Sequence, residues 1–160
     1  ITRVYLDTTV PNYLFADDRP DRQEITKKFF ADVKSKNIKI FTSSVTEREI
    51  SKTKDSLKKN QLLKAIQQFQ VKTIITEEEK RLAQLYLKNK IVPEKYLDDA
   101  LHLALATVER VDALISWNFK HMVNLKVKKG INKINIENGF QTLEIITPEE
   151  FIGGENENIA

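Results

Sequence analysis

Short hydrophobic runs alternate with longer segments of helical periodicity along this chain of 160 residues. The short runs lie at residues 4–6, 38–41, 71–75, 113–115 and 142–146. Each has the length and apolar content that are typical of a buried β-strand. The pattern therefore predicts about five strands, separated by segments that are long enough to form helices.

The intervening segments place apolar side chains on one face of a helix. In residues 24–33 this face consists of Ile25, Phe29, Phe30 and Val33. Three further stripes lie in residues 57–69, 82–86 and 97–108, and Thr76 followed by Glu79 is a capping-box signature that predicts the start of the third of these four helices. Residues 131–139 fit neither pattern, and we interpret them as an excursion before a last edge strand.

Alternating strands and helices predict an α/β fold with a mainly parallel sheet that helices cover on both faces. A chain of this length can bury one core, and no long Gly, Ser or Pro linker divides it. We therefore expect a single domain over residues 1–152, followed by a flexible tail over residues 153–160.

Composition narrows the class of protein. Hydrophobic residues make up 41% and charged residues 31%, which is typical of a soluble globular protein. No apolar run reaches the length of a membrane span and no signal peptide opens the sequence, so we expect no membrane association. The absence of cysteine excludes disulfides and thiolate metal sites, and it fits a cytoplasmic location.

Positive charge is concentrated in one segment, although the net charge is only 26 − 23 = +3. Between residues 120 and 133 there are five lysines and no acid: Lys120, Lys126, Lys128, Lys129 and Lys133. Such a segment suits a polyanionic substrate, because phosphate contacts dominate affinity for nucleic acids. On charge alone, a solvated lysine-rich loop is the alternative interpretation.

Four acid or amide side chains form a candidate metal site. Asp7, Glu49 and Asn118 follow hydrophobic runs, and Asp99 opens an apolar helical segment. A parallel sheet gathers the carboxyl ends of its strands at one edge, where open α/β folds bind ligands. Carboxylates crowded there repel one another unless a hard cation such as Mg²⁺ or Mn²⁺ neutralises them. Metal-assisted phosphodiester hydrolysis is the simplest function of such a cluster.

Each of the first two acids also has a structural interpretation. Asp7 could cap a helix, although the N–H groups of that helix would equally hold it ionised. A phosphoaspartate-forming hydrolase would also use this aspartate, but Thr9 replaces the second aspartate that such enzymes use. Glu49 fits a capping box with Thr46, as Glu47 does with Ser44. The apolar Ile50 favours an inward-facing Glu49.

The remaining candidate residues also have both a functional and a structural interpretation. Asp98 and Asp99 diverge by about 100° on a helix, so only one of them can face an ion, and either could cap the helix. Asn118 could supply a neutral ligand or end a strand as an Asx turn. Trp117 is expected to pack rather than to stack on a base. His102 and His121 are too scattered to indicate zinc, and no Ser/His/Asp nucleophile motif is present.

Taken together, these positions resemble the PIN-domain family, which includes the VapC-type toxins of bacterial toxin–antitoxin pairs. The matching stretches are residues 5–10, 42–50, 99–106 and 114–122, and the resemblance extends from Val4 to about Phe151. It implies a three-layer α/β/α sandwich. It also implies that Asp7, Glu49 and Asp99 are the acidic metal ligands. Asn118 falls where many members have a fourth aspartate, and Ser116 where many have Ser or Thr.

The resemblance implies an endoribonuclease that depends on Mg²⁺ or Mn²⁺. Asn118 would then position water, while Thr9 and Ser116 would hydrogen-bond the metal ligands. Trp117, Lys120 and His121 would either support the metal ligands or contact the RNA. The expected partners are the RNA substrate, a small antitoxin and a second copy of the chain. The alternative function is a catalytically weak or inactive RNA- or protein-binding module on the same fold.

Overall fold

The computed structural model describes the backbone of residues 1–159 and the side chains of residues 1–154. Its centre is a sheet of five parallel strands, in the order β3-β2-β1-β4-β5. The strands are β1 (Arg3–Leu6), β2 (Lys39–Ser43), β3 (Gln70–Lys72), β4 (Ala113–Ile115) and β5 (Glu144–Ile146). The predicted parallel sheet of about five strands is confirmed.

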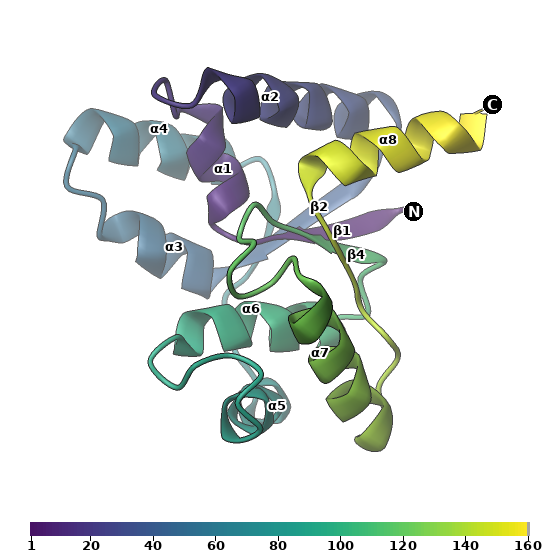
Figure 1. Ribbon diagram of the computed structural model, residues 1–160. Coiled ribbons are helices and arrows are strands. Elements are labelled where there is room, and N and C mark those ends of the chain that lie inside the picture. The colour runs from purple at the N-terminus through teal and green to yellow at the C-terminus, as the bar shows by residue number, and fades with distance from the viewer. Residues whose placement is uncertain (160) are drawn as a thin grey trace.

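Helices cover both faces of this sheet and give three layers (Figure 1). One layer contains α1 (Thr9–Leu14), α2 (Pro20–Ser35), α4 (Ser56–Ile66) and α8 (Pro148–Ile159). The other contains α5 (Glu77–Lys88), α6 (Leu97–Val108) and α7 (Leu125–Glu137). The short helix α3 (Ser44–Ser51) follows β2 directly and leads to α4. The α/β/α sandwich that the resemblance implied is therefore confirmed.

Strand alternation divides the core between the two layers. In β1, Val4 and Leu6 pack with Phe29 and Phe151 on the side of α2 and α8. Tyr5 points to the other side, into the cluster formed largely by α5, α6 and α7. Successive side chains of a strand point to opposite faces, so these three buried residues pack into both helical layers. The strand is therefore held firmly up to Leu6, the residue before Asp7.

The structure corrects the interpretation of residues 131–139. They do not form an irregular excursion, because most of them belong to helix α7, in which Val127, Ile131 and Ile134 are buried along one face. Asn124 caps its first turn, and Gly139 follows its end with a φ of 80°, a conformation that glycine adopts without strain. Lysines and asparagines between the apolar positions concealed this periodicity.

Two helix starts test the capping predictions. Thr76 caps α5 as predicted, and its side-chain oxygen accepts a hydrogen bond from the Glu79 N–H at 3.2 Å. The predicted cap Ser44 of α3 is wrong, because Ser43 is the cap and accepts from the Val45 N–H. Ser43 has the extended backbone that a cap residue needs, whereas Ser44 is already helical.

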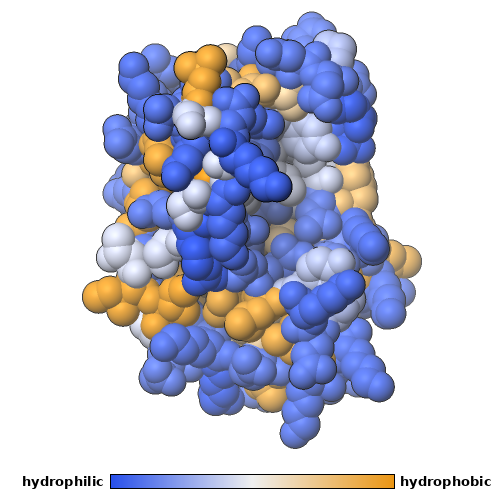
Figure 2. Space-filling view, turned by 90° about the vertical axis from the view of Figure 1, so that its left-hand side faces the viewer, coloured by the Kyte–Doolittle hydropathy of each residue, from blue (hydrophilic) through white to orange (hydrophobic). Residues whose placement is uncertain are grey.

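The predicted flexible tail over residues 153–160 lies largely outside the residues whose side chains are described, so it stays a prediction. Within the described part of the chain, no helix combines the length and apolarity that crossing a bilayer requires. Seen from the side of α3 and α4, the surface is mostly hydrophilic, with hydrophobic residues gathered in a band across it (Figure 2).

A buried hydrogen-bond network joins the three helices of one layer, and it provides a test of the packing. The Tyr86 hydroxyl donates to Asn135 Oδ1 at 2.5 Å, and Asn135 Nδ2 donates to Thr107 Oγ1 at 3.1 Å. We expect Tyr86→Phe to lower the free energy of unfolding by about 1–3 kcal/mol, because it leaves a buried amide oxygen without its donor. Urea denaturation measures this loss.

The matched control is Tyr96→Phe, since the Tyr96 hydroxyl makes no hydrogen bond within the described residues. Its free energy of unfolding should stay within about 0.5 kcal/mol of the wild type. Equal losses in the two variants would contradict the importance of the network.

Candidate active site

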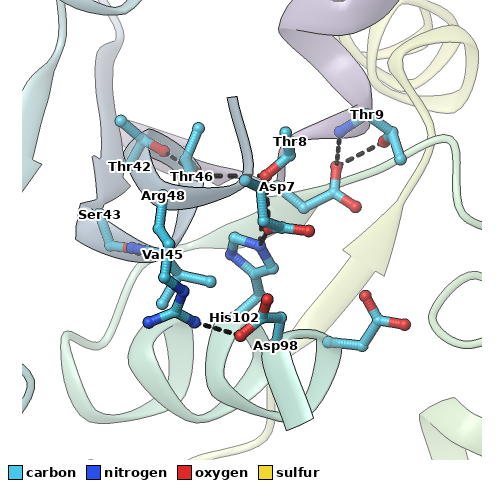
Figure 3. Close-up of polar contacts among 12 residues, drawn as sticks. Asp7, Thr8, Thr9, Thr42, Ser43, Val45, Thr46, Arg48, Asp98 and His102 are labelled. Carbon is cyan, nitrogen blue, oxygen red and sulfur yellow. Dashed lines mark hydrogen bonds and ion pairs between the residues drawn. The ribbon is translucent and has the colours of Figure 1, made fainter. Parts of the chain in front are cut away.

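The candidate site lies where the direction of strand addition reverses. From β1 the chain builds outward to β2 and β3, whereas β4 returns to the other side of β1 and is followed by β5. The crevice at the carboxyl ends of β1 and β4 is therefore a topological switch point, where open α/β sheets bind ligands. Asp7 follows β1 directly, and Ser116 follows β4. Figure 3 shows the polar contacts around Asp7.

Asp7 is buried and surrounded by hydrogen-bond donors. Its Oδ1 accepts from the Thr9 hydroxyl at 2.5 Å and from the Thr9 N–H at 3.2 Å, and its Oδ2 accepts from the Ser116 hydroxyl at 2.7 Å. Burial nevertheless raises the pKa of Asp7 to about 6, and the charge of Asp99 acts in the same direction. The ionised carboxylate is therefore poorly stabilised by the protein alone.

Glu49 extends from α3 toward the same region. Its Oε1 accepts from the Thr8 hydroxyl at 2.7 Å and lies 2.6 Å from His102 Nε2. Burial raises the pKa of Glu49, but the hydrogen bond and charge of His102 outweigh it, and the net shift is downward. Glu49 is therefore held ionised, and its orientation is set by two side-chain donors.

His102 is the residue that sequence reasoning missed. It is 1% exposed, and its Nδ1 lies 2.7 Å from the Tyr5 hydroxyl, which in turn lies 2.8 Å from Ser43 Oγ. Burial lowers the pKa of His102, but the hydrogen bond and charge of Glu49, with smaller contributions from Asp7 and Asp99, raise it overall. The available signal was its position three residues after Asp99, on the same face of α6.

The two adjacent aspartates of α6 separate as their helical positions predict. Asp98 turns outward and forms an ion pair with Arg48 of α3 (Figure 3). The Asp99 side chain is 17% exposed, and its Oδ2 lies 2.8 Å from His121 Nδ1. Burial raises the pKa of Asp99, the hydrogen bond of His121 opposes this, and the charge of Glu49 adds to it.

The segment after β4 borders Asp99. Asn118 Nδ2 donates to Asp99 Oδ2 at 3.5 Å, while Asn118 Oδ1 accepts from the His121 N–H at 2.9 Å. The side chain of Asn118 therefore accepts a hydrogen bond within the turn, as an Asx turn does, and also faces Asp99, while its predicted part in the site stays a prediction. Trp117 is 5% exposed and packs as expected, whereas Lys120 lies at the surface.

The side chains present match the preferences of a hard divalent cation. Three carboxylates and an amide come from separate segments, and Asp99 raises the pKa of Asp7 as Glu49 raises that of Asp99. This mutual effect is what a positive ion would relieve. Among the described residues, no three His, Cys, Asp or Glu side chains are arranged to bind one ion. Glu49 Oε1 is turned toward His102 and Thr8.

Comparison with known proteins identifies the class. A family model described as the PIN domain matches residues 4–118. Because this match covers most of the chain, the protein belongs to the PIN domain family. No curated protein matches it.

Two solved structures are similar in fold. The first is the crystal structure of VapBC2 from Rickettsia felis bound to a DNA fragment from their promoter, with a TM-score of 0.58 and 16% identity over 91% of this chain and 98% of that one. The second is a toxin–antitoxin complex from Klebsiella pneumoniae, with a TM-score of 0.58 and 18% identity over 78% of this chain and 93% of that one. At these identities, the similarity establishes the fold.

The raised pKa of Asp7 gives a prediction about stability. The pKa of Asp7 rises from 3.8 to about 6 on folding. Its favourable contribution to the free energy of unfolding is therefore complete below pH 3.8 and is lost as the pH rises through 6. The ionised group then costs about 3 kcal/mol, at about 1.4 kcal/mol per unit. In EDTA, Asp7→Asn should therefore raise the free energy of unfolding near pH 7 by up to about this amount, and the gain should vanish near pH 4.

Urea denaturation at the two pH values measures the gain, with Asp98→Asn as the matched control. Asp98 forms an ion pair near the surface, so its loss should change stability by less than about 1 kcal/mol. A gain for Asp7→Asn that is the same at both pH values would show that burial of the charge is not its cause.

Proposed function

We propose that this protein is an endoribonuclease that depends on Mg²⁺ or Mn²⁺. The observation that supports this most strongly is the charge interaction of Asp7 with Asp99, and of Asp99 with Glu49, beside the switch point of a PIN fold. Three acids from distant parts of the chain share this region, and two of them are destabilised as anions. Such a site is suited to a cation and to a substrate that a cation activates, and a phosphodiester is such a substrate.

Asp7, Glu49 and Asp99 would hold one or two of these ions. A bound divalent ion would supply a Lewis acid that stabilises charge developing on the phosphate and makes water easier to deprotonate.

The surrounding residues of the chain fix the three acids in orientation. Thr9 and Ser116 hold Asp7, and Thr8 and His102 hold Glu49. His121 and Asn118 hold Asp99. Partners of this kind set the direction of a ligand and commonly affect metal affinity by about 10–100-fold.

The lysine-rich segment would guide the RNA backbone toward the site. It comprises Lys120 and four lysines of α7: Lys126, Lys128, Lys129 and Lys133. In the part of the chain that the structure describes, none of these five forms an ion pair with an acid. Their charge is therefore available to phosphates, whose neutralisation provides most of the affinity for nucleic acids.

A small antitoxin is the protein partner that we propose, which would make this chain the toxin of a pair in the cytoplasm. The two similar structures described above are VapBC2 bound to promoter DNA and a toxin–antitoxin complex. The hydrophobic band in Figure 2 also supports a protein partner, either an antitoxin or a second copy of the chain. A cavity of about 250 Å³ also lies between α3, α5 and α6, and its lining includes Arg48, Ile75 and Leu97.

A catalytically inactive RNA-binding module is the second candidate, and a specific observation favours it. Glu49 is paired with His102, and Asn118 supplies a neutral amide at the position where the family resemblance implies a fourth acid. Such a module would bind RNA equally well in EDTA and would not cleave it. The proposed nuclease would stop cleaving in EDTA and resume when Mn²⁺ is restored.

Replacement of Asp99 by Asn tests the nuclease directly. We expect Asp99→Asn to slow Mn²⁺-dependent RNA cleavage by more than the roughly 10–100-fold typical of losing a residue that only orients a ligand. Circular dichroism should show an unchanged fold. A gel assay of a labelled single-stranded RNA, in a preparation free of other ribonucleases, measures the rate.

Asp98→Asn is the matched control, because the two positions are adjacent and only Asp99 faces the site. It should cleave at the wild-type rate. Wild-type cleavage by Asp99→Asn would contradict the proposed site, and equal loss in both variants would show that the effect is not specific to it.

A further inference from the structure

A guanidinium group stacked among three aromatic rings lies beside the candidate site. The Arg22 guanidinium carbon is 5.3 Å from the ring centroid of Tyr13, 5.3 Å from that of Trp117 and 5.2 Å from that of Phe119. Arg22 Nη1 also donates to the Tyr13 hydroxyl at 2.9 Å. These contacts join α1, α2 and the segment after β4, and they fix the position of the cation.

This cluster is connected to Asp7 by two hydrogen bonds. The Trp117 N–H donates to Thr9 Oγ1 at 2.9 Å, and the Thr9 hydroxyl donates to Asp7 at 2.5 Å. Phe119 is the neighbour of Asn118, whose amide faces Asp99. A cavity of about 480 Å³ has both Thr9 and Tyr13 in its lining. The aromatic cluster is therefore attached through Thr9 to Asp7 and lies next in sequence to the residue that faces Asp99.

Two members of the cluster are available to a ligand. Arg22 has several N–H donors, and within the described residues its only side-chain acceptor is the Tyr13 hydroxyl, with no acid among its partners. Phe119 is 46% exposed, although large aromatic side chains are usually covered. Trp117 is packed beneath them, and its indole N–H donates to Thr26 Oγ1 at 2.9 Å.

We infer that Phe119 and Arg22 form a nucleotide subsite that selects single-stranded RNA. Phe119 stacks on a base, and the Arg22 guanidinium contacts the adjoining phosphate. Every base has a π face and every nucleotide a phosphate, so this pair recognises RNA irrespective of sequence. In a duplex the bases are stacked on one another and cannot reach the ring. The inference rests on the proposed function, because it names the substrate class of the same site.

Binding without cleavage tests the subsite separately from catalysis. Fluorescence anisotropy in EDTA would compare three labelled probes of one sequence: a single strand of about 12 nucleotides, within the range that single-strand binding sites cover, its duplex, and the single strand with its bases removed. Wild type should bind the single strand more tightly than the duplex. Phe119→Ala should weaken single-strand binding by about tenfold and leave binding of the abasic strand unchanged.

Matched variants separate stacking from general effects. Phe119→Leu keeps apolar bulk without a π face and should lose affinity as Phe119→Ala does, whereas Ile136→Ala removes a 63% exposed side chain from α7 and should not. Arg22→Lys keeps the charge but not the planar group and should weaken binding by about fivefold. Arg81→Lys, on the exposed face of α5, should bind as wild type does.

The single tryptophan of the chain gives a second measurement that needs no label. Trp117 lies 6.4 Å from Phe119 between ring centroids, so a base stacked on Phe119 should change its emission. The single strand should produce this change in EDTA, and the abasic strand should not.

Three results would overturn the subsite: no single-strand binding by wild type in EDTA, unchanged affinity in Phe119→Ala, or an equal loss with the abasic strand. The proposed function is tested by Mn²⁺-dependent cleavage, which is a separate readout. If cleavage depends on Asp99 but Phe119→Ala binds the single strand as tightly as wild type, the subsite alone is rejected. Base-dependent binding without cleavage would support the subsite and reject the nuclease.

Discussion

The electrostatic cost of gathering acids at one edge of a parallel sheet governs this structure. Asp7 is held at the end of β1, a strand whose three preceding residues are buried in both layers of the core. It cannot move toward solvent without disrupting that strand, so its pKa rises to about 6 instead. Such local destabilisation occurs in natural proteins mainly at functional sites. Most of the other polar side chains of the site form hydrogen bonds with the acids and so reduce the cost of burying their charges.

Two histidines stabilise the other two acids, Glu49 and Asp99. His102 pairs with Glu49 and is itself held by the Tyr5 hydroxyl, while His121 pairs with Asp99. These contacts stabilise the negative charges of Glu49 and Asp99, and they also define what a bound ion must displace or accept. In this view Glu49 and Asp99 are preorganised by their partners, whereas Asp7 depends most strongly on a cation for its charge.

Much of the fold was predictable from the sequence, because strands such as residues 4–6 and the stripe of α6 have unambiguous periodicity. Helix α7 was not, since its buried face is narrow and its other positions are lysine and asparagine. Within the site, a strand-end position predicted Asp7, and helical geometry predicted that Asp98 and Asp99 would face different directions. The role of His102 depends on its distance from Glu49, which no local pattern encodes. The cluster around Arg22 likewise combines three segments that only the folded chain brings together.

The proposed function requires that a divalent ion binds to and stabilises Asp7, Glu49 and Asp99 together. Calorimetric titration of Mn²⁺ tests it most directly, because no RNA or partner is needed. The account predicts saturable binding by wild type and by Asp98→Asn, and a loss of that binding in Asp99→Asn. Identical binding curves for Asp99→Asn and wild type, or no binding by wild type, would contradict it.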